Sequence, residues 1–127
     1  MLHTTNTSRV VAWIFVVPMT LFLLMAGGTK ILGINPLGSI EAMSQWVFFI
    51  GLGEVTAAIL FAIPRTSIIG ALFLSAHLGG AILFHILRGE SLMGPILTSF
   101  WFQSLMLASV WFVVLLRYPA VISNFEK

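Results

Sequence analysis

The sequence predicts an all-α integral membrane protein, a bundle of four transmembrane helices with antiparallel neighbours and both termini in the cytoplasm. Three observations predict this fold. The 127 residues are 59% hydrophobic and only 8% charged, and the mean hydropathy of +1.08 lies outside the usual range of soluble domains. Four long stretches carry no charged residue apart from a single glutamate. These stretches lack the alternation of transmembrane β-strands, so each is predicted to be a helix.

The uncharged stretches also predict how the chain is divided. A helix that crosses a membrane needs roughly 20 mostly apolar residues. We therefore predict spans at about 10–31, 46–64, 66–87 and 95–117 in a single domain over 9–118, with a flexible polar tail at 1–8 and a short tail at 119–127.

Turn-forming residues separate the spans. Gly33-Ile-Asn-Pro-Leu-Gly38 predicts a turn, and Pro64-Arg-Thr66 predicts a tight reversal between the second and third spans. Small residues four positions apart, among them Gly53 and Ala57, predict faces on which helices pack closely. Basic residues set the orientation by their excess on the cytoplasmic side. That side would carry Arg9, Arg65, Arg117 and Lys127, against Lys30 and Arg88 on the other.

Glu54 is the residue around which the functional prediction is built, because a carboxylate inside a span usually has a partner or a role. Counting about 1.5 Å of rise per residue predicts two layers of polar groups. The inner layer contains Glu54, His77 and Gln103, and the outer layer contains Lys30, His85 and Arg88. The layers are consistent with an outward-facing polar pocket, with a proton-handling site, or with Glu54 pairing only to close the bundle.

Several kinds of site are disfavoured. The chain contains no cysteine, which excludes thiol–disulfide chemistry and thiolate metal sites. His77 and His85 are eight residues apart on one predicted helix, too far to bind one metal ion together, so no metal site is predicted. Basic residues are scattered, which does not indicate nucleic-acid binding. Lys30 alone is typical of a lysine that extends from a helix end to the membrane surface, although it could also face an anionic group or Glu54.

Three motifs, taken in order, resemble the DoxX-like family of small bacterial membrane proteins. Ala26-Gly-Gly-Thr-Lys-Ile-Leu32 is similar to the family's Gly-x-x-Lys-Leu, and Gly51-Leu-Gly-Glu54 is similar to its Gly-x-x-Glu. The stretch from Pro64 to His85 is similar to its Pro-Arg-Thr…Gly-Gly-Ala…His pattern. The resemblance covers residues 26–85. It implies a four-helix bundle in the inner membrane, an association with redox complexes such as thiosulfate:quinone oxidoreductase, and motif positions at Lys30, Glu54 and His85.

The leading hypothesis is a multi-pass inner-membrane protein that binds a quinone or another lipophilic molecule and supports a membrane redox process. Glu54 would exchange protons, Lys30, His85 and Arg88 would contact the polar head, and His77 and Gln103 would complete the pocket floor. The chain has no evident cofactor of its own, so a membrane or peripheral redox protein would supply the electrons.

Two alternatives remain open. The first is a stand-alone membrane enzyme in which Glu54 and His77 are the catalytic acid–base pair for a hydrophobic substrate. The second is a non-catalytic structural or assembly subunit, in which Glu54 holds the helices together. Self-association of the chain in the bilayer is compatible with each hypothesis.

Overall fold

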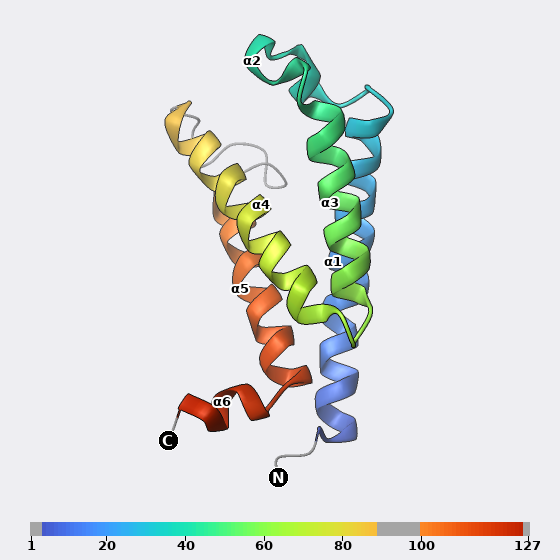
Figure 1. Ribbon diagram of the computed structural model, residues 1–127, viewed down its shortest axis with the longest axis vertical. Coiled ribbons are helices and arrows are strands. Elements are labelled where there is room, and N and C mark those ends of the chain that lie inside the picture. The colour runs from blue at the N-terminus through green and yellow to red at the C-terminus, as the bar shows by residue number, and fades with distance from the viewer. Residues whose placement is uncertain (1–3, 89–99, 126–127) are drawn as a thin grey trace. The chain divides into compact units, whose positions relative to one another are not determined.

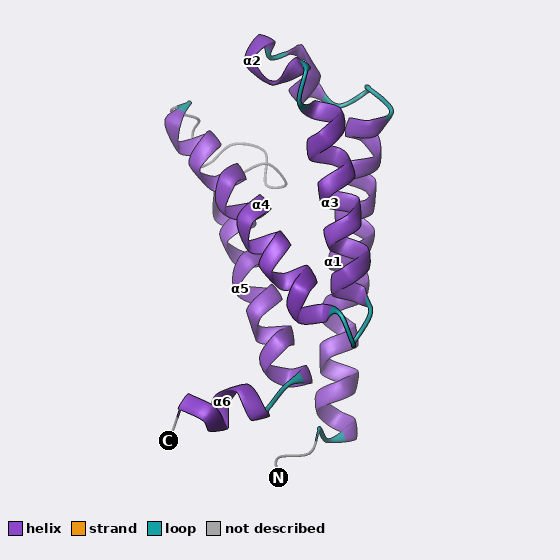
Figure 2. Cartoon of the chain, in the orientation of Figure 1, coloured by secondary structure: helices purple, strands orange, loops and turns teal. Residues whose placement is uncertain are grey.

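The computed structural model describes residues 4–88 and 100–125, which form helices and connecting turns with no strand among them (Figures 1 and 2). The predicted all-α class is therefore confirmed. The elements in chain order are α1 (Asn6–Ile31), the 3-10 turn η1 (Pro36–Ser39), α2 (Glu41–Ser44), α3 (Val47–Ala62), α4 (Ser67–Leu87), α5 (Phe100–Arg117) and α6 (Ala120–Phe125).

Helices α1 and α4 are long and apolar enough to cross a membrane. Their 26 and 21 residues correspond to about 39 Å and about 32 Å of helix, against ~30 Å of hydrocarbon in a bilayer. Helices α3 and α5 are shorter and apolar. The first residues of the fourth predicted span, 95–99, lie outside the described residues.

Both ends of the described chain contain helix where short tails are predicted. Helix α1 begins at Asn6, because Thr5 caps it: the Ser8 amide donates to Thr5 Oγ1 over 3.1 Å. Helix α6 occupies Ala120–Phe125.

Contacts between Cα atoms divide the chain into two units. Residues 16–73 form the central unit, which contains most of α1, the connection through α2, helix α3 and the start of α4. The terminal unit comprises residues 1–15 and 74–127. The single predicted domain stays a prediction.

In the central unit, hydrogen bonds and a glycine end α1. Gly33 has a φ of 74°, a left-handed conformation that glycine adopts without steric cost. Its amide donates to the Lys30 carbonyl over 3.2 Å, and the Ile34 amide donates to the Thr29 carbonyl over 3.1 Å, which together form a Schellman motif. The Asn35 side chain also donates to Thr29 Oγ1 over 3.0 Å. These hydrogen bonds thus connect the predicted turn to the last turn of α1.

The connection between α3 and α4 is held by hydroxyl groups that bond to the end of α3. Ser67 Oγ donates to the Phe61 carbonyl over 3.0 Å, and Thr66 Oγ1 donates to the Leu60 carbonyl over 2.7 Å. Both carbonyls lie in the last turn of α3, whose acceptors have no partner within the helix. Gly70 then lies against the Phe61 backbone so closely that a built Cβ would collide with the nitrogen and Cα of Phe61.

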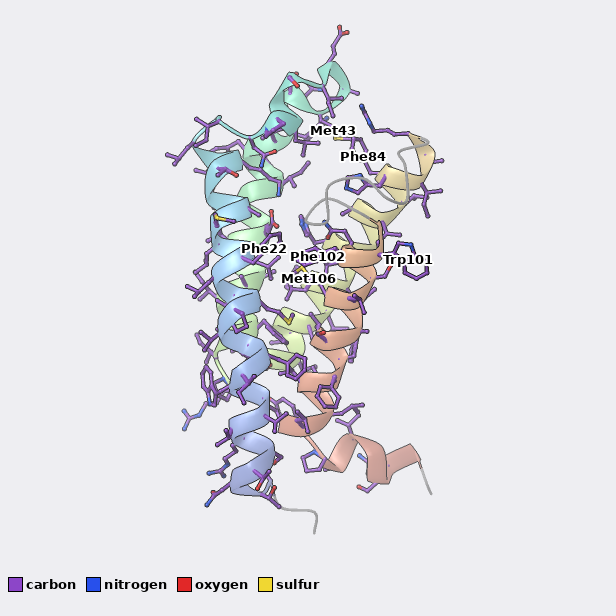
Figure 3. All side chains as sticks on the ribbon, turned by 180° about the vertical axis from the view of Figure 1, so that it is seen from behind. Phe22, Met43, Phe84, Trp101, Phe102 and Met106 are labelled. Atoms are coloured by element: carbon purple, nitrogen blue, oxygen red, sulfur yellow. The ribbon has the colours of Figure 1, made fainter. Side chains whose placement is uncertain are left out.

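In the terminal unit, α5 is joined to two other segments. Trp111 Nε1 on α5 donates to Ser75 Oγ on α4 over 2.9 Å. At the end of α5, the Arg117 guanidinium lies 5.0 Å from the centroid of the Trp13 ring on α1, within the range of a cation–π contact. Trp101 and Met106 project from different sides of α5 (Figure 3).

Large apolar side chains are exposed on each of the longer helices. The exposed side chains include Val17, Leu21 and Met25 on α1, Phe48, Phe49, Leu52 and Ile59 on α3, Leu72, Phe73 and Leu83 on α4, and Trp101, Leu105 and Phe112 on α5. Soluble monomers rarely expose large contiguous apolar patches.

We expect Gly70→Ala to lower the free energy of unfolding by about 1–3 kcal/mol, because the added methyl group overpacks the contact with α3. Gly80→Ala on the same helix is the matched control, since no atom of the described residues lies within 4 Å of a Cβ built there. Denaturant unfolding in detergent micelles measures both variants. Equal stability of the two variants would contradict the close approach at Gly70.

Candidate functional site

The candidate site is an ion pair between helices α1 and α3 in the central unit. Lys30 Nζ on α1 donates to Glu54 Oε2 on α3. The Lys30 side chain is 12% exposed and the Glu54 side chain is 4% exposed. A buried carboxylate and a partly buried ammonium therefore meet between helices whose neighbouring residues are mainly apolar.

Two glycines make this meeting possible. Gly27 lies three residues before Lys30, and Gly51 lies three residues before Glu54. A Cβ built at Gly51 would lie 2.6 Å from the Gly27 carbonyl oxygen and 2.7 Å from Lys30 Cβ, while one built at Gly27 would lie 2.7 Å from Val55 Cγ2. Because no side chain separates the backbones here, α1 and α3 approach closely enough for the charges to pair.

The direction of the helices aims the two side chains at each other. Gly27 contacts Val55 and Gly51 contacts Lys30, so α1 and α3 are antiparallel and lie side by side (Figure 1). Side chains on a helix lean toward its N-terminus, and the N-termini of these helices point in opposite directions. Lys30 and Glu54, offset along the helices by about one turn, therefore lean toward one another.

The pair is an energetic constraint on the central unit. Removing one partner of a buried ion pair typically costs about 3–5 kcal/mol, because the other charge is left uncompensated, whereas replacing both with apolar residues is often neutral. Lys30 also lies in the last turn of α1, where a positive charge interacts favourably with the helix dipole.

The other predicted site residues belong to the terminal unit. His77 and His85 are half-buried on α4, and Gln103 is half-buried on α5. Arg88 follows the end of α4, and its guanidinium carbon lies 5.3 Å from the centroid of the Phe84 ring. The described contacts bring Lys30 and Glu54 together. The layer that would join Glu54 to His77 and Gln103, and the catalytic pair of Glu54 and His77, stay predictions.

The structural role of Gly27 and Gly51 is a finding that the sequence interpretation missed. That interpretation assigned close packing on this helix to Gly53 and Ala57. Ala57 is buried, but Gly53 is exposed, and no described atom lies within 4 Å of a Cβ built on it. The available signal was the matching spacing of Gly27 to Lys30 and Gly51 to Glu54. Within residues 4–88 and 100–125, no group of three or more His, Asp or Glu side chains could hold a metal ion.

Comparisons with protein-family models, with curated proteins and with solved structures found no match to this chain. The resemblance to the DoxX-like family stays a prediction.

We expect Gly51→Ala to separate α1 from α3 and to weaken the ion pair. The added methyl group meets a backbone oxygen, which cannot rotate away, so a loss of about 1–3 kcal/mol of stability is expected from overpacking alone. Gly53→Ala, two residues along the same helix, is the control and should be no less stable than the wild type. Unfolding of the two variants side by side in detergent is the measurement.

The ion pair itself predicts a non-additive double-mutant cycle. Lys30→Met and Glu54→Met should each lower stability by about 3–5 kcal/mol, whereas the double variant should unfold close to the wild type. Glu41→Gln, which removes an exposed carboxylate of the same unit, should change little. Additive losses in the double variant would show that Lys30 and Glu54 do not depend on each other.

Proposed function

We propose that the chain is a four-helix protein of the bacterial inner membrane, with antiparallel neighbouring helices and both termini in the cytoplasm. The lengths of α1 and α4 and the large apolar side chains exposed on all four longer helices support a lipid environment, since lipid covers such surfaces without cost. The excess of basic residues at one side of the predicted spans supports the orientation.

At the Lys30–Glu54 pair, in this proposal, the protein binds a quinone or another lipophilic molecule with a polar head, and so supports a membrane redox process. The observation that carries the proposal is that a buried carboxylate, Glu54, pairs with a partly buried lysine, Lys30, between apolar helices. Charged groups inside membrane helices are costly and usually serve a ligand, a proton or an ion. Lys30 lies in the last turn of α1, the end that the sequence assigns to the outer side.

The two charged residues have complementary roles in this proposal. The Lys30 ammonium donates to an acceptor oxygen of the ligand head, and the Glu54 carboxylate exchanges protons with it. His85 and Arg88 are further contacts for the head, and His77 and Gln103 complete the pocket. The electrons come from a protein partner, because none of these side chains is a redox group.

The second candidate function is a structural clasp, by which we mean an ion pair that only holds α1 and α3 together. The close approach of α1 and α3 at Gly27 and Gly51, directly beside the pair, favours it. In a membrane, helices associate through close backbone packing and polar contacts, and the Lys30–Glu54 pair provides both. A subunit that only assembles with partners would need no ligand at the pair.

The double variant Lys30→Met/Glu54→Met separates the two functions, because it removes the charges while retaining a folded unit. We expect the wild type to bind a short-chain quinone in detergent or nanodiscs, and the double variant to bind it at least about tenfold more weakly, the loss expected when a charged hydrogen-bond donor is removed. Quenching of tryptophan fluorescence reports binding, and mass spectrometry of organic extracts identifies molecules that co-purify.

Glu41→Gln serves as the binding control and should match the wild type. Equal binding by the wild type and an equally stable double variant would reject a site at the pair. Absence of any ligand from a wild type that still assembles with partners would favour the clasp.

A further inference from the structure

The starting observation is the unused hydrogen-bonding capacity of Lys30. A lysine ammonium has three N–H donors and no acceptor. In the described part of the chain, Lys30 Nζ donates to Glu54 Oε2 and has no other partner. Its side chain is only 12% exposed, so two donors lie where little solvent reaches them. Donors in such a place favour an acceptor atom that comes from outside the protein.

The charge of the pair decides which acceptor fits. The positive charge of Lys30 is already balanced by the negative charge of Glu54, which accepts its hydrogen bond. A neutral carbonyl oxygen can accept from Lys30 without changing the charge balance. A carboxylate or phosphate would bring a second negative charge next to Glu54, in surroundings where little water screens the repulsion.

We propose that Glu54 is a specificity-determining residue, which restricts the Lys30 site to uncharged carbonyl ligands and excludes lipid anions such as fatty acids. This inference depends on the proposed ligand-binding function and adds the chemical class that the site accepts.

The Glu54→Gln variant tests whether the charge of residue 54 sets the ligand preference. Glutamine keeps the size of the side chain and can still accept from Lys30 through its carbonyl oxygen, but it carries no charge. Among the described residues, Lys30 would then be a partly buried cation with no anionic partner. The variant should bind an anionic lipid in preference to a neutral one, which inverts the specificity of the wild type.

The experiment compares methyl undecyl ketone with laurate at neutral pH, because these molecules have the same hydrocarbon tail and differ in the charge of the head. Retention of each radiolabelled ligand by nanodiscs is measured for the wild type, Glu54→Gln and Glu41→Gln. The Lys30→Met/Glu54→Met variant supplies the background from lipid partitioning. We expect the wild type and Glu41→Gln to prefer the ketone by about tenfold or more, and Glu54→Gln to prefer laurate.

Preference of the wild type for laurate, or an unchanged preference in a folded Glu54→Gln, would overturn the inference. If Glu54→Gln does not fold, the ratio of ketone to laurate retained by the wild type tests the inference alone. Binding of the quinone together with a preference for laurate would reject the charge selection but retain the proposed function. Absence of binding of the quinone, the ketone and laurate above background would reject both.

Discussion

The central unit depends on one constraint: two opposite charges must meet where almost no water reaches them. A buried ion pair is favourable only at short range and in good geometry, so α1 and α3 have to be close and correctly rotated at Lys30 and Glu54. Gly27 and Gly51 provide the closeness, and the antiparallel course of the helices aims the two side chains at each other. The hydrogen bonds that end α1 at Gly33 fix the turn of helix on which Lys30 lies.

In the proposed function, the same pair holds the helices together and binds a ligand. The two roles place different requirements on its side chains. For stability, neither charge may lack its partner. Replacing both residues with apolar residues of similar size also meets this condition. Ligand binding requires the charges themselves, and in particular the donors of Lys30 that Glu54 does not use. In the proposed function, the paired charges make the site polar without adding net charge, and the expected ligand is therefore a neutral molecule dissolved in the bilayer.

Part of the site could be predicted from the sequence. Glu54 was identified because a carboxylate in an apolar helix is unusual, and Lys30 because it lies near the end of a span. Counting residues placed them in different layers, since the count follows Cα positions and ignores the lean and length of the side chains. The lysine has a four-carbon stem, which spans the offset. The packing glycines were misassigned on α3 because Gly51 and Gly53 are two residues apart and only the rotation of the helix distinguishes them.

The helical class and the apolar character of the chain follow from the amino-acid sequence. Helix formation and hydropathy depend on local composition and spacing, which can be read without knowing any neighbour. Packing in three dimensions sets which charge neutralises Glu54 and which glycines let the backbones touch. Those outcomes depend on which faces of two helices meet, and the total packing of α1 against α3 selects those faces. Lys30 is therefore a partly buried partner of Glu54, although its position alone favours a side chain extended to the membrane surface.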